Sequence, residues 1–367
     1  MGNSAIEEKM DAARKLGHAL AADAAGAIDS VYIAGSLTAG LGNPTSDADL
    51  FVLLRPGVPV PDDAGQYTVD GHRVDVERFP LDEVEATVEE VVGFELSRDN
   101  LTDLHKLPKK LDFVLRLNSS ETVVESEALL LMRRRIADST AALRRTAINY
   151  SAITLNGHLE DFLGAASEGD LDTAAFAGQD LVAYAGKALA AASGDLYFSN
   201  KWVYKQLTRT PIDGFPLELF RHYQRGAWTE RGTAAAESLV LFTQTCVAVS
   251  QLLAEAGVPL GAWPSWQPGT QGTRLWRNTT FNVLRVSEGV LLHWELNRQL
   301  VLKEQPAYVW ALCDGRSVDE IVAGVNSLGE SVPALEGMTR ERVEAVLAAL
   351  QKRGLVGTEP FSFLGTV

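Results

Sequence analysis

The spacing of apolar residues near the N-terminus predicts a small sheet. Residues 31–34 (VYIA) and 50–54 (LFVLL) are continuous apolar runs, which are typical of buried strands. Residues 72–79 (HRVDVERF) alternate apolar and polar side chains, which indicates a half-buried strand. The VDG sequence at residues 69–71 predicts a hairpin turn that joins this strand to a partner at residues 66–69.

Helical spacing dominates the middle of the chain. Apolar residues recur at helical intervals over residues 5–25 and again from residue 81. Residues 120–256 are rich in Ala and Leu, with Gly and Asp at the breaks, and this texture is typical of a helical bundle. Residues 256–276 are rich in Pro, Gly and Trp and lack any period, so we expect a linker there.

A different pattern follows the expected linker. Three short apolar runs (FNVLRV, VLLHW and QLVL) predict strands, and three helical stretches come after them. The second helical stretch begins at Ser317 and has Glu320 three residues later, which is a capping box. The third begins at Thr339 and ends at Gly354, a residue type that commonly ends helices. We therefore expect a small domain of three strands and three helices.

Composition and charge narrow the class of protein. A chain of 367 residues is long enough for two or three domains, and 46% hydrophobic residues are typical of a globular protein. The formal net charge of −15 disfavours binding to nucleic acid. No signal peptide is recognisable, and the longest apolar stretch, residues 237–257, is interrupted by Thr, Gln and Ser. With only two distant cysteines, Cys246 and Cys313, the sequence predicts a cytoplasmic protein that does not bind membranes.

Two aspartates, Asp47 and Asp49, carry the candidate chemistry. On a strand, side chains two residues apart point to the same face. Neighbouring ionised carboxylates repel each other unless a cation lies between them, and Mg²⁺ prefers oxygen ligands. Asp75 and Glu77 share one face of the half-buried strand, and we choose Asp75 as the third ligand. Two Mg²⁺ ions roughly 4 Å apart would then align the attacking and leaving oxygens of a phosphoryl or nucleotidyl transfer.

The residues before these aspartates suit a phosphate group. Gly35 permits a tight turn, and Ser36 offers a hydroxyl and a backbone N–H near the start of a short helix. Gly35-Ser36, Gly40 and the SDADL sequence at residues 46–50 together resemble the nucleotidyltransferase signature of the DNA polymerase β superfamily. The resemblance covers about residues 28–80.

This resemblance implies an activity and a set of site residues. It implies that Asp47 and Asp49 bind both metal ions and that Asp75 is a third acid that also activates an acceptor hydroxyl. It further implies that the substrate is ATP or another nucleoside triphosphate, bound through Gly35, Ser36 and Ser46.

A second candidate for nucleotide binding lies in the helical region. The sequence DLYFSNKWVYKQLTR at residues 195–209 mixes basic and aromatic residues. It is similar to the segment through which the helical domain of small-molecule nucleotidyltransferases places a lysine on the nucleotide phosphates. Lys201 is the candidate, and Lys205 lies one helical turn later on the same face.

The C-terminal pattern resembles the PqqD-like domains that recognise leader peptides of ribosomally made, modified peptides. The resemblance covers about residues 278–358 and depends mostly on core and turn positions. It implies that a leader peptide adds as a strand to the sheet edge beside the third helix. In this chain the residues for peptide binding would be Arg298, Leu300, Leu302, Arg340 and Arg342.

The sequence therefore predicts an α+β fold in three parts. A nucleotidyltransferase domain with a mixed sheet and flanking helices spans residues 1–118, a helical bundle domain spans residues 119–258, and a linker at residues 259–277 leads to a winged-helix domain at residues 278–358. The expected activity is Mg²⁺-dependent nucleotidyl transfer to a precursor peptide held through its leader. Two alternatives stay open, namely a nucleotidyltransferase for a small molecule such as an aminoglycoside and a non-catalytic scaffold that binds leader peptides. The sequence leaves the nucleobase, the acceptor atom and the oligomeric state open.

Overall fold

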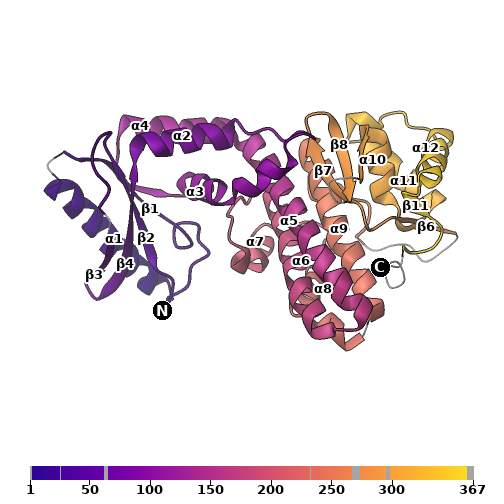
Figure 1. Ribbon diagram of the computed structural model, residues 1–367, viewed down its shortest axis with the longest axis horizontal. Helices are drawn as coiled ribbons and strands as arrows, with labels where there is room; N and C mark the ends of the chain where they lie inside the picture. The colour runs from indigo at the N-terminus through magenta and orange to yellow at the C-terminus, as the bar shows by residue number, and fades with distance from the viewer. Residues whose placement is uncertain are drawn as a thin grey trace. The chain divides into compact units, whose positions relative to one another are not determined.

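The computed structural model describes residues 2–24, 26–61, 65–231, 233–266, 273–294 and 298–361. They divide into two units, each of which is described by itself. The first unit contains residues 1–94, 106–143 and 197–199, and the second contains residues 95–105, 144–196 and 200–367 (Figure 1). The fold class is α+β, as the sequence predicts.

The first unit is built on a five-stranded mixed sheet with the strand order β3-β4-β2-β1-β5. Strands β2 and β4 are parallel, and the other neighbouring pairs are antiparallel. The predicted strands and the predicted hairpin are confirmed. At its turn, Asp70 and Gly71 both have positive φ, at 51° and 81°, as a type I′ turn requires. The strands are β1 (Ile28–Ala34), β2 (Ala48–Leu54), β3 (Gly65–Val69), β4 (His72–Pro80) and β5 (Glu121–Val124).

Helices of the first unit pack on both faces of this sheet. Helix α1 covers one face, where its apolar side chains bury Val31, Ile33, Leu50 and Val52. The opposite face carries a stack of aromatic rings, in which Phe51 lies 6.0 Å from Phe113 of α3. Because side chains alternate along a strand, Asp49 lies on the same face as Phe51. The helices are α1 (Gly2–Asp23), α2 (Leu81–Val92), α3 (Pro108–Asn118) and α4 (Glu127–Asp138).

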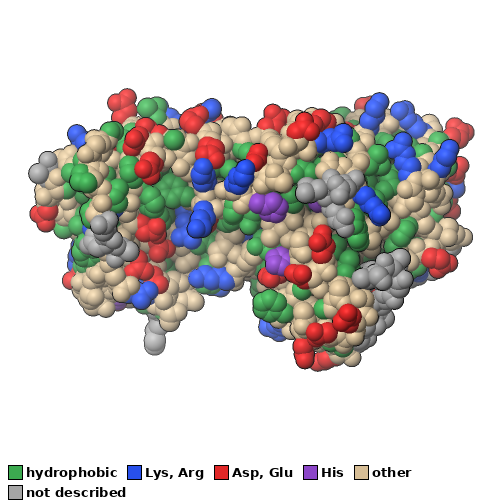
Figure 2. Space-filling view, viewed as in Figure 1, with side chains coloured by type: hydrophobic (Ala, Val, Ile, Leu, Met, Phe, Trp, Pro, Cys, Tyr) green, Lys and Arg blue, Asp and Glu red, His purple; other side chains and the backbone are tan. Residues whose placement is uncertain are grey.

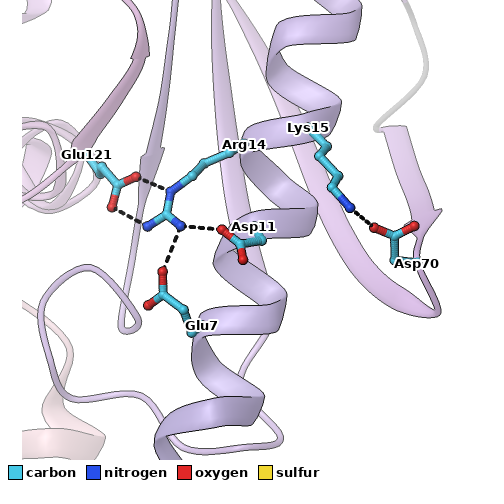
Figure 3. Close-up of polar contacts among 6 residues, drawn as sticks. All are labelled: Glu7, Asp11, Arg14, Lys15, Asp70 and Glu121. Atoms are coloured by element: carbon cyan, nitrogen blue, oxygen red, sulfur yellow. Dashed lines mark hydrogen bonds and ion pairs between the residues drawn. The ribbon is translucent and has the colours of Figure 1, made fainter.

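Charged contacts join α1 to two edges of the sheet (Figure 3). Arg14 donates to Glu121 of β5 at 2.6 and 3.1 Å, and it also contacts Glu7 and Asp11 of its own helix. Lys15 reaches Asp70 in the hairpin turn at 2.5 Å. Both partners of the Lys15 pair are exposed, so this pair contributes little to stability, whereas Arg14 joins three carboxylates at once.

The second unit begins with a helical bundle in which α6 packs along α9. By length and composition alone, residues 235–255 of α9 could cross a membrane, but 83% of that window is buried inside the protein, as in a core helix. Most of α5 (Thr140–Glu168) also belongs to this unit. The other elements are α6 (Leu171–Ala192), α7 (Val203–Arg209), α8 (Leu217–Gln224) and α9 (Thr233–Glu255), with short 3₁₀ turns at Leu101–Lys106, Asn200–Trp202, Ala227–Arg231 and Leu260–Ala262.

Two three-stranded sheets and three helices form the C-terminal part of the second unit. The predicted strands form one sheet, with the order β7-β8-β9. The predicted capping box is confirmed, since Ser317 and Glu320 exchange both hydrogen bonds. The elements of this part are β7 (Asn282–Val286), β8 (Gly289–Trp294), β9 (Arg298–Leu302), α10 (Glu304–Leu312), β10 (Asp314–Ser317), α11 (Val318–Gly329), the 3₁₀ turn Pro333–Leu335, α12 (Arg340–Lys352) and β11 (Val356–Gly357).

The second of these sheets is not anticipated by the sequence. Its order is β10-β6-β11, and its central strand β6 (Arg274–Arg277) lies in the stretch that we interpret as a linker. Four residues are too few for an alternating pattern to stand out, and β6 is recognisable only through its distant partners. Residues 267–272 of the expected linker lie outside the described residues.

Candidate active site

The site lies where β1 ends and β2 begins, in the first unit. Asp49 is paired with Ala34 of β1 on one side and with Asp75 of the parallel strand β4 on the other. Because Asp49 and Asp75 are in register on neighbouring strands, their side chains project from the same face of the sheet. This is the face that carries Phe51 and α3. The two carboxylates that the sequence analysis pairs across strands are therefore neighbours.

Gly35 is fixed by two independent requirements. Its φ is +97°, a conformation that residues with a side chain rarely adopt. A Cβ atom at this position would also lie 2.2 Å from Oδ2 of Asp49, which is far inside van der Waals contact. The glycine thus leaves the space in which the Asp49 carboxylate lies.

Ser36 begins a tight loop rather than a helix. We expected a short helix after Ser36, but residues 36–40 form only turns. The backbone C=O of Ser36 accepts the N–H groups of Leu41 and Gly42 at 2.9 and 2.7 Å, so the loop closes on itself. Gly40 has a φ of +67°, a backbone conformation outside the right-handed helix, so the chain turns there instead of continuing as a helix. Ser36 is only 8% exposed.

Ser46 closes the next loop, just before the two aspartates. Its Oγ accepts the backbone N–H of Asn43 at 3.0 Å, and Lys9 of α1 donates to its C=O at 2.6 Å. The hydroxyl of Ser46 therefore holds the loop that precedes Asp47.

Asp47 is held by a cation of the protein itself. It lies one residue before β2, so the assumption that Asp47 and Asp49 share one strand is wrong, because the loop of Ser46 continues up to this residue. Nη2 of Arg73 lies 2.7 Å from Oδ2 of Asp47 and 3.6 Å from Oδ2 of Asp75. Asp75 also accepts a hydrogen bond of 2.9 Å from Gln66. Arg73 thus contributes positive charge between two of the three predicted acids.

Asp49 is the electrostatically unusual member of the group. Burial raises its pKa to about 6; Arg116 opposes this shift, while Glu77, Asp75 and Asp47 add to it. Burial likewise raises the pKa of Glu77, again against the effect of Arg116. Burial is therefore the main cause of both shifts, and the neighbouring carboxylates add to it.

Sequence reasoning missed Arg116 and its neighbours. Nε of Arg116 lies 2.9 Å from Asp112, one helical turn earlier on α3. Tyr197, from the short segment 197–199 that belongs to the first unit, is also buried here, and burial raises its pKa while Arg116 lowers it. The only local signal was the spacing of an acid and a base on one helix face, and that spacing is common on solvated helices.

The donor set has the chemistry that Mg²⁺ requires. Asp47, Asp49 and Asp75 offer only oxygen ligands, and a divalent ion would compensate the charge of the Asp49 carboxylate, whose pKa is raised mainly by burial. Across the described parts of the chain, no three His, Cys, Asp or Glu side chains are gathered closely enough to form a metal site. Arg73 bridges two of these acids instead, as described above.

Lys201 and Lys205 belong to the second unit. Their ammonium groups lie 5.1 and 4.5 Å from the ring centroid of Trp202, so both cations are over one indole. Trp202 itself is buried, whereas both lysine side chains are exposed. Lys201 lies in the 3₁₀ turn Asn200–Trp202 and Lys205 in α7, so the shared helix face stays a prediction.

The predicted peptide-binding edge is β9, an outer strand of its sheet. The backbone N–H and C=O of Arg285 bond to Asn149 and therefore point away from β8. Because the direction of these groups alternates along an antiparallel ladder, this fixes which residues of β8 and β9 point outward. Through the observed register, Leu300 and Leu302 bond to β8, while Gln299 and Val301 present their peptide groups to the outer edge. The side chain of Leu302 is only 6% exposed, because it is part of the core.

The arginines chosen for peptide binding differ from one another. Arg298 and Arg342 are exposed. Arg340 is already paired with Asp319 and Glu344, at 2.7 and 2.8 Å, so its charge is balanced within the domain. Sequence spacing could indicate the pair with Glu344, which lies four residues later on the same helix, but not the pair with Asp319, which lies on a different helix.

Comparisons with known proteins agree with the two resemblances. Residues 19–118 match the family model described as nucleotidyltransferase domain. Residues 288–356 match the family model described as Coenzyme PQQ synthesis protein D (PqqD). No curated protein matches the chain.

Proposed function

Because the chain carries a nucleotidyltransferase domain at residues 19–118 and a PqqD domain at residues 288–356, we propose that it transfers a nucleotidyl group to a ribosomally made precursor peptide. The donor is ATP or another nucleoside triphosphate, and the peptide is bound through its leader. Nucleotidyl transfer is the activity of the first family, and the proposal adds the donor, the metal and the acceptor.

The observation that carries the proposal is the register of β2 on β4. It places Asp49 beside Asp75, and Gly35 leaves room for the Asp49 carboxylate. A stabilising role alone does not explain a buried, crowded carboxylate whose pKa is raised to about 6. Perturbed acids of this kind are common at catalytic sites.

The proposed reaction is a displacement at the α-phosphorus. An acceptor oxygen or nitrogen attacks this atom, the bond to the β-phosphate oxygen breaks, and pyrophosphate leaves. The acceptor proton passes to the carboxylate of Asp75, which Gln66 holds by a hydrogen bond of 2.9 Å. Asp47, Asp49 and Asp75 would hold two Mg²⁺ ions, whose positive charge would help to neutralise and align the triphosphate.

The loop residues and the lysine pair are the proposed contacts to the triphosphate. Gly35, Ser36 and Ser46 lie in the two loops that precede the acids. Lys201 and Lys205 form a compact pair of positive charges on Trp202, which suits an anionic group. We assign these five residues to nucleotide binding.

The peptide is proposed to add to β9 as a strand. Val301 presents its N–H and C=O along the outer edge, and the exposed Arg298 and Arg342 would attract acidic residues of a leader. Nucleic acid is outside the proposed partners because of the net charge of −15. Figure 2 shows basic side chains interspersed with acidic ones on the face in view. The proposed location is the cytoplasm.

One experiment separates the proposal from its alternatives. Purified protein is incubated with Mg²⁺, each nucleoside triphosphate and the peptide encoded beside its gene, and the products are analysed by mass spectrometry. We expect one nucleotidyl mass on the peptide, and we expect Asp49→Asn to abolish it. A nucleotidyl mass on aminoglycosides but not on the peptide would favour the small-molecule enzyme. Peptide binding without any transfer would favour the scaffold.

A further inference from the structure

The outer edge of β7 is closed by a side chain that imitates a strand. Arg285 donates its backbone N–H to Oδ1 of Asn149 at 3.0 Å, and its C=O accepts from Nδ2 of the same residue at 2.8 Å. These are the two hydrogen bonds that a residue of a fourth strand would exchange with Arg285. Asn149 comes from α5, in the helical bundle, and is 1% exposed.

The neighbouring outward N–H groups of β7 and the turn after it also have acceptors. Val283 donates to Oδ1 of Asn282 at 2.9 Å, and Ser287 donates to the C=O of Leu96 at 2.9 Å. The N–H groups of Val283, Arg285 and Ser287, which alternate along this edge, are therefore all bonded to acceptors other than the backbone of a neighbouring strand. An incoming peptide finds no free donor on this side.

Asn149 is itself held in place from a second helix. Its Oδ1 also accepts from Nε2 of Gln251 on α9, at 2.8 Å. Asn282 adds a hydrogen bond of 2.7 Å to the C=O of Ala152 on α5. Because these groups are buried, each bond is hard to replace with water, and the C-terminal sheet has a fixed position on the bundle.

We propose that Asn149 is a positioning residue that takes the place of a fourth strand. It closes the β7 edge to added peptides and fixes the recognition sheet to α5, so that only the β9 edge can accept a strand. The role in peptide recognition rests on the proposed function, because it concerns a peptide bound at β9. A leader bound at β9 would therefore have a fixed position relative to the helical bundle, because the sheet that binds it is hydrogen-bonded to α5.

Hydrogen exchange in the full chain tests this inference without nucleotide or peptide. The variant is Asn149→Leu, and the matched control is Asn156→Leu, which changes the same residue type on the same helix at a half-exposed position. We expect the amides of residues 283–287 to exchange at least about tenfold faster in Asn149→Leu, with those of β8 unchanged. The control should match the wild type. Equal protection of residues 283–287 in both variants would overturn the inference.

A distance measurement tests the rigid connection. Spin labels are placed at Gly157→Cys on α5, where a Cβ meets no atom within 4 Å, and at Ala348→Cys on α12, which is exposed. Cys246 and Cys313 are buried and should not react. We expect a narrow distance distribution that broadens when Asn149→Leu is added. If that variant fails to fold, Asn149→Ser, which is too short to reach both groups of Arg285, replaces it. An unchanged narrow distribution would contradict the proposal.

These outcomes are independent of catalysis. If the protein transfers no nucleotidyl group but residues 283–287 lose protection in Asn149→Leu, the proposed function fails and the positioning role stands. If transfer occurs but the protection is unchanged, the positioning role fails alone.

Discussion

At the residue scale, Gly35 gives a sharp test of the site because its two requirements can be separated. Gly35→Ala introduces both an unfavourable φ and a Cβ atom 2.2 Å from Oδ2 of Asp49. We expect nucleotidyl transfer to fall by about a hundredfold or more, since displacement of a reacting group by an ångström has that effect. The matched control is Gly26→Ala, which has a φ of +85° but meets no atom within 4 Å.

The control variant isolates the backbone effect from the contact effect. Gly26→Ala should cost roughly 1–2 kcal/mol of stability and leave the rate of transfer near that of the wild type. Initial rates and urea unfolding of both variants are the measurements. Equal activity in the two variants would show that the Asp49 carboxylate does not depend on the space beside Gly35.

A second residue, His293, predicts how stability depends on pH. It is 4% exposed on β8, and burial lowers its pKa to about 4. Because its folded pKa lies below the ordinary value of about 6.5, the unfolded chain binds the proton first as the pH falls. The contribution of the neutral His293 side chain to the free energy of unfolding is therefore complete above pH 6.5 and is lost between pH 6.5 and pH 4.

This dependence can be measured against a variant that cannot titrate. Between pH 7.5 and pH 5, the free energy of unfolding should fall by about 2 kcal/mol more in the wild type than in His293→Leu. Urea unfolding followed by tryptophan fluorescence at both pH values gives the difference. Identical losses in the two proteins would show that His293 does not titrate as its burial implies.

At the element scale, the register of β9 on β8 decides which of its residues bond to β8 and which point their backbone groups to the outer edge, a difference that the sequence does not show. Val301 presents its N–H to the outer edge, so Val301→Pro removes a donor there without breaking the ladder to β8. We expect the affinity for a leader peptide to fall at least about tenfold, measured by fluorescence anisotropy. Val301→Ala keeps the N–H and should bind nearly as the wild type does. Full affinity in Val301→Pro would exclude strand addition at this edge.

The elements also show what sequence could and could not predict. The strands around Asp49, the VDG hairpin and the capping box of Ser317 follow from local patterns, and the structure confirms them. Strand β6 was missed because it has only four residues and is recognisable as a strand only through its pairing with the distant strands β10 and β11. Arg116 was missed for a similar reason: it lies far along the chain from the aspartates, and only the stacking of α3 on the sheet places it near them.

At the scale of the whole molecule, the C-terminal part is not a detachable module. Asn149 and Gln244 of the bundle donate to the backbone C=O groups of Arg285 and Thr279. Gln251 donates to Asn149 and so holds its side chain in place. Arg277 of β6 is fully buried and donates to the C=O of Leu241 on α9 at 3.0 Å. A chain truncated after residue 273 would leave the side-chain amides of Asn149 and Gln244 without these C-terminal partners, each at a cost of about 1–3 kcal/mol.

We therefore expect the chain truncated after residue 273 to lose the cooperative unfolding of its helical bundle and to aggregate. Thermal unfolding followed by circular dichroism, together with size-exclusion chromatography, measures this. A monodisperse truncated protein with an unchanged melting temperature would show that the PqqD domain folds and acts apart from the bundle.

The central claim is that the acids at the head of β2 catalyse nucleotidyl transfer to a peptide. The most direct measurement uses ATP labelled in turn at the α- and the γ-phosphate, with Mg²⁺ and the precursor peptide. If ATP is the donor, the α-label should appear on the peptide and the γ-label in pyrophosphate, and Asp47→Asn and Asp49→Asn should abolish both. A γ-label on the peptide, or an α-label transferred equally well by both variants, would contradict the account.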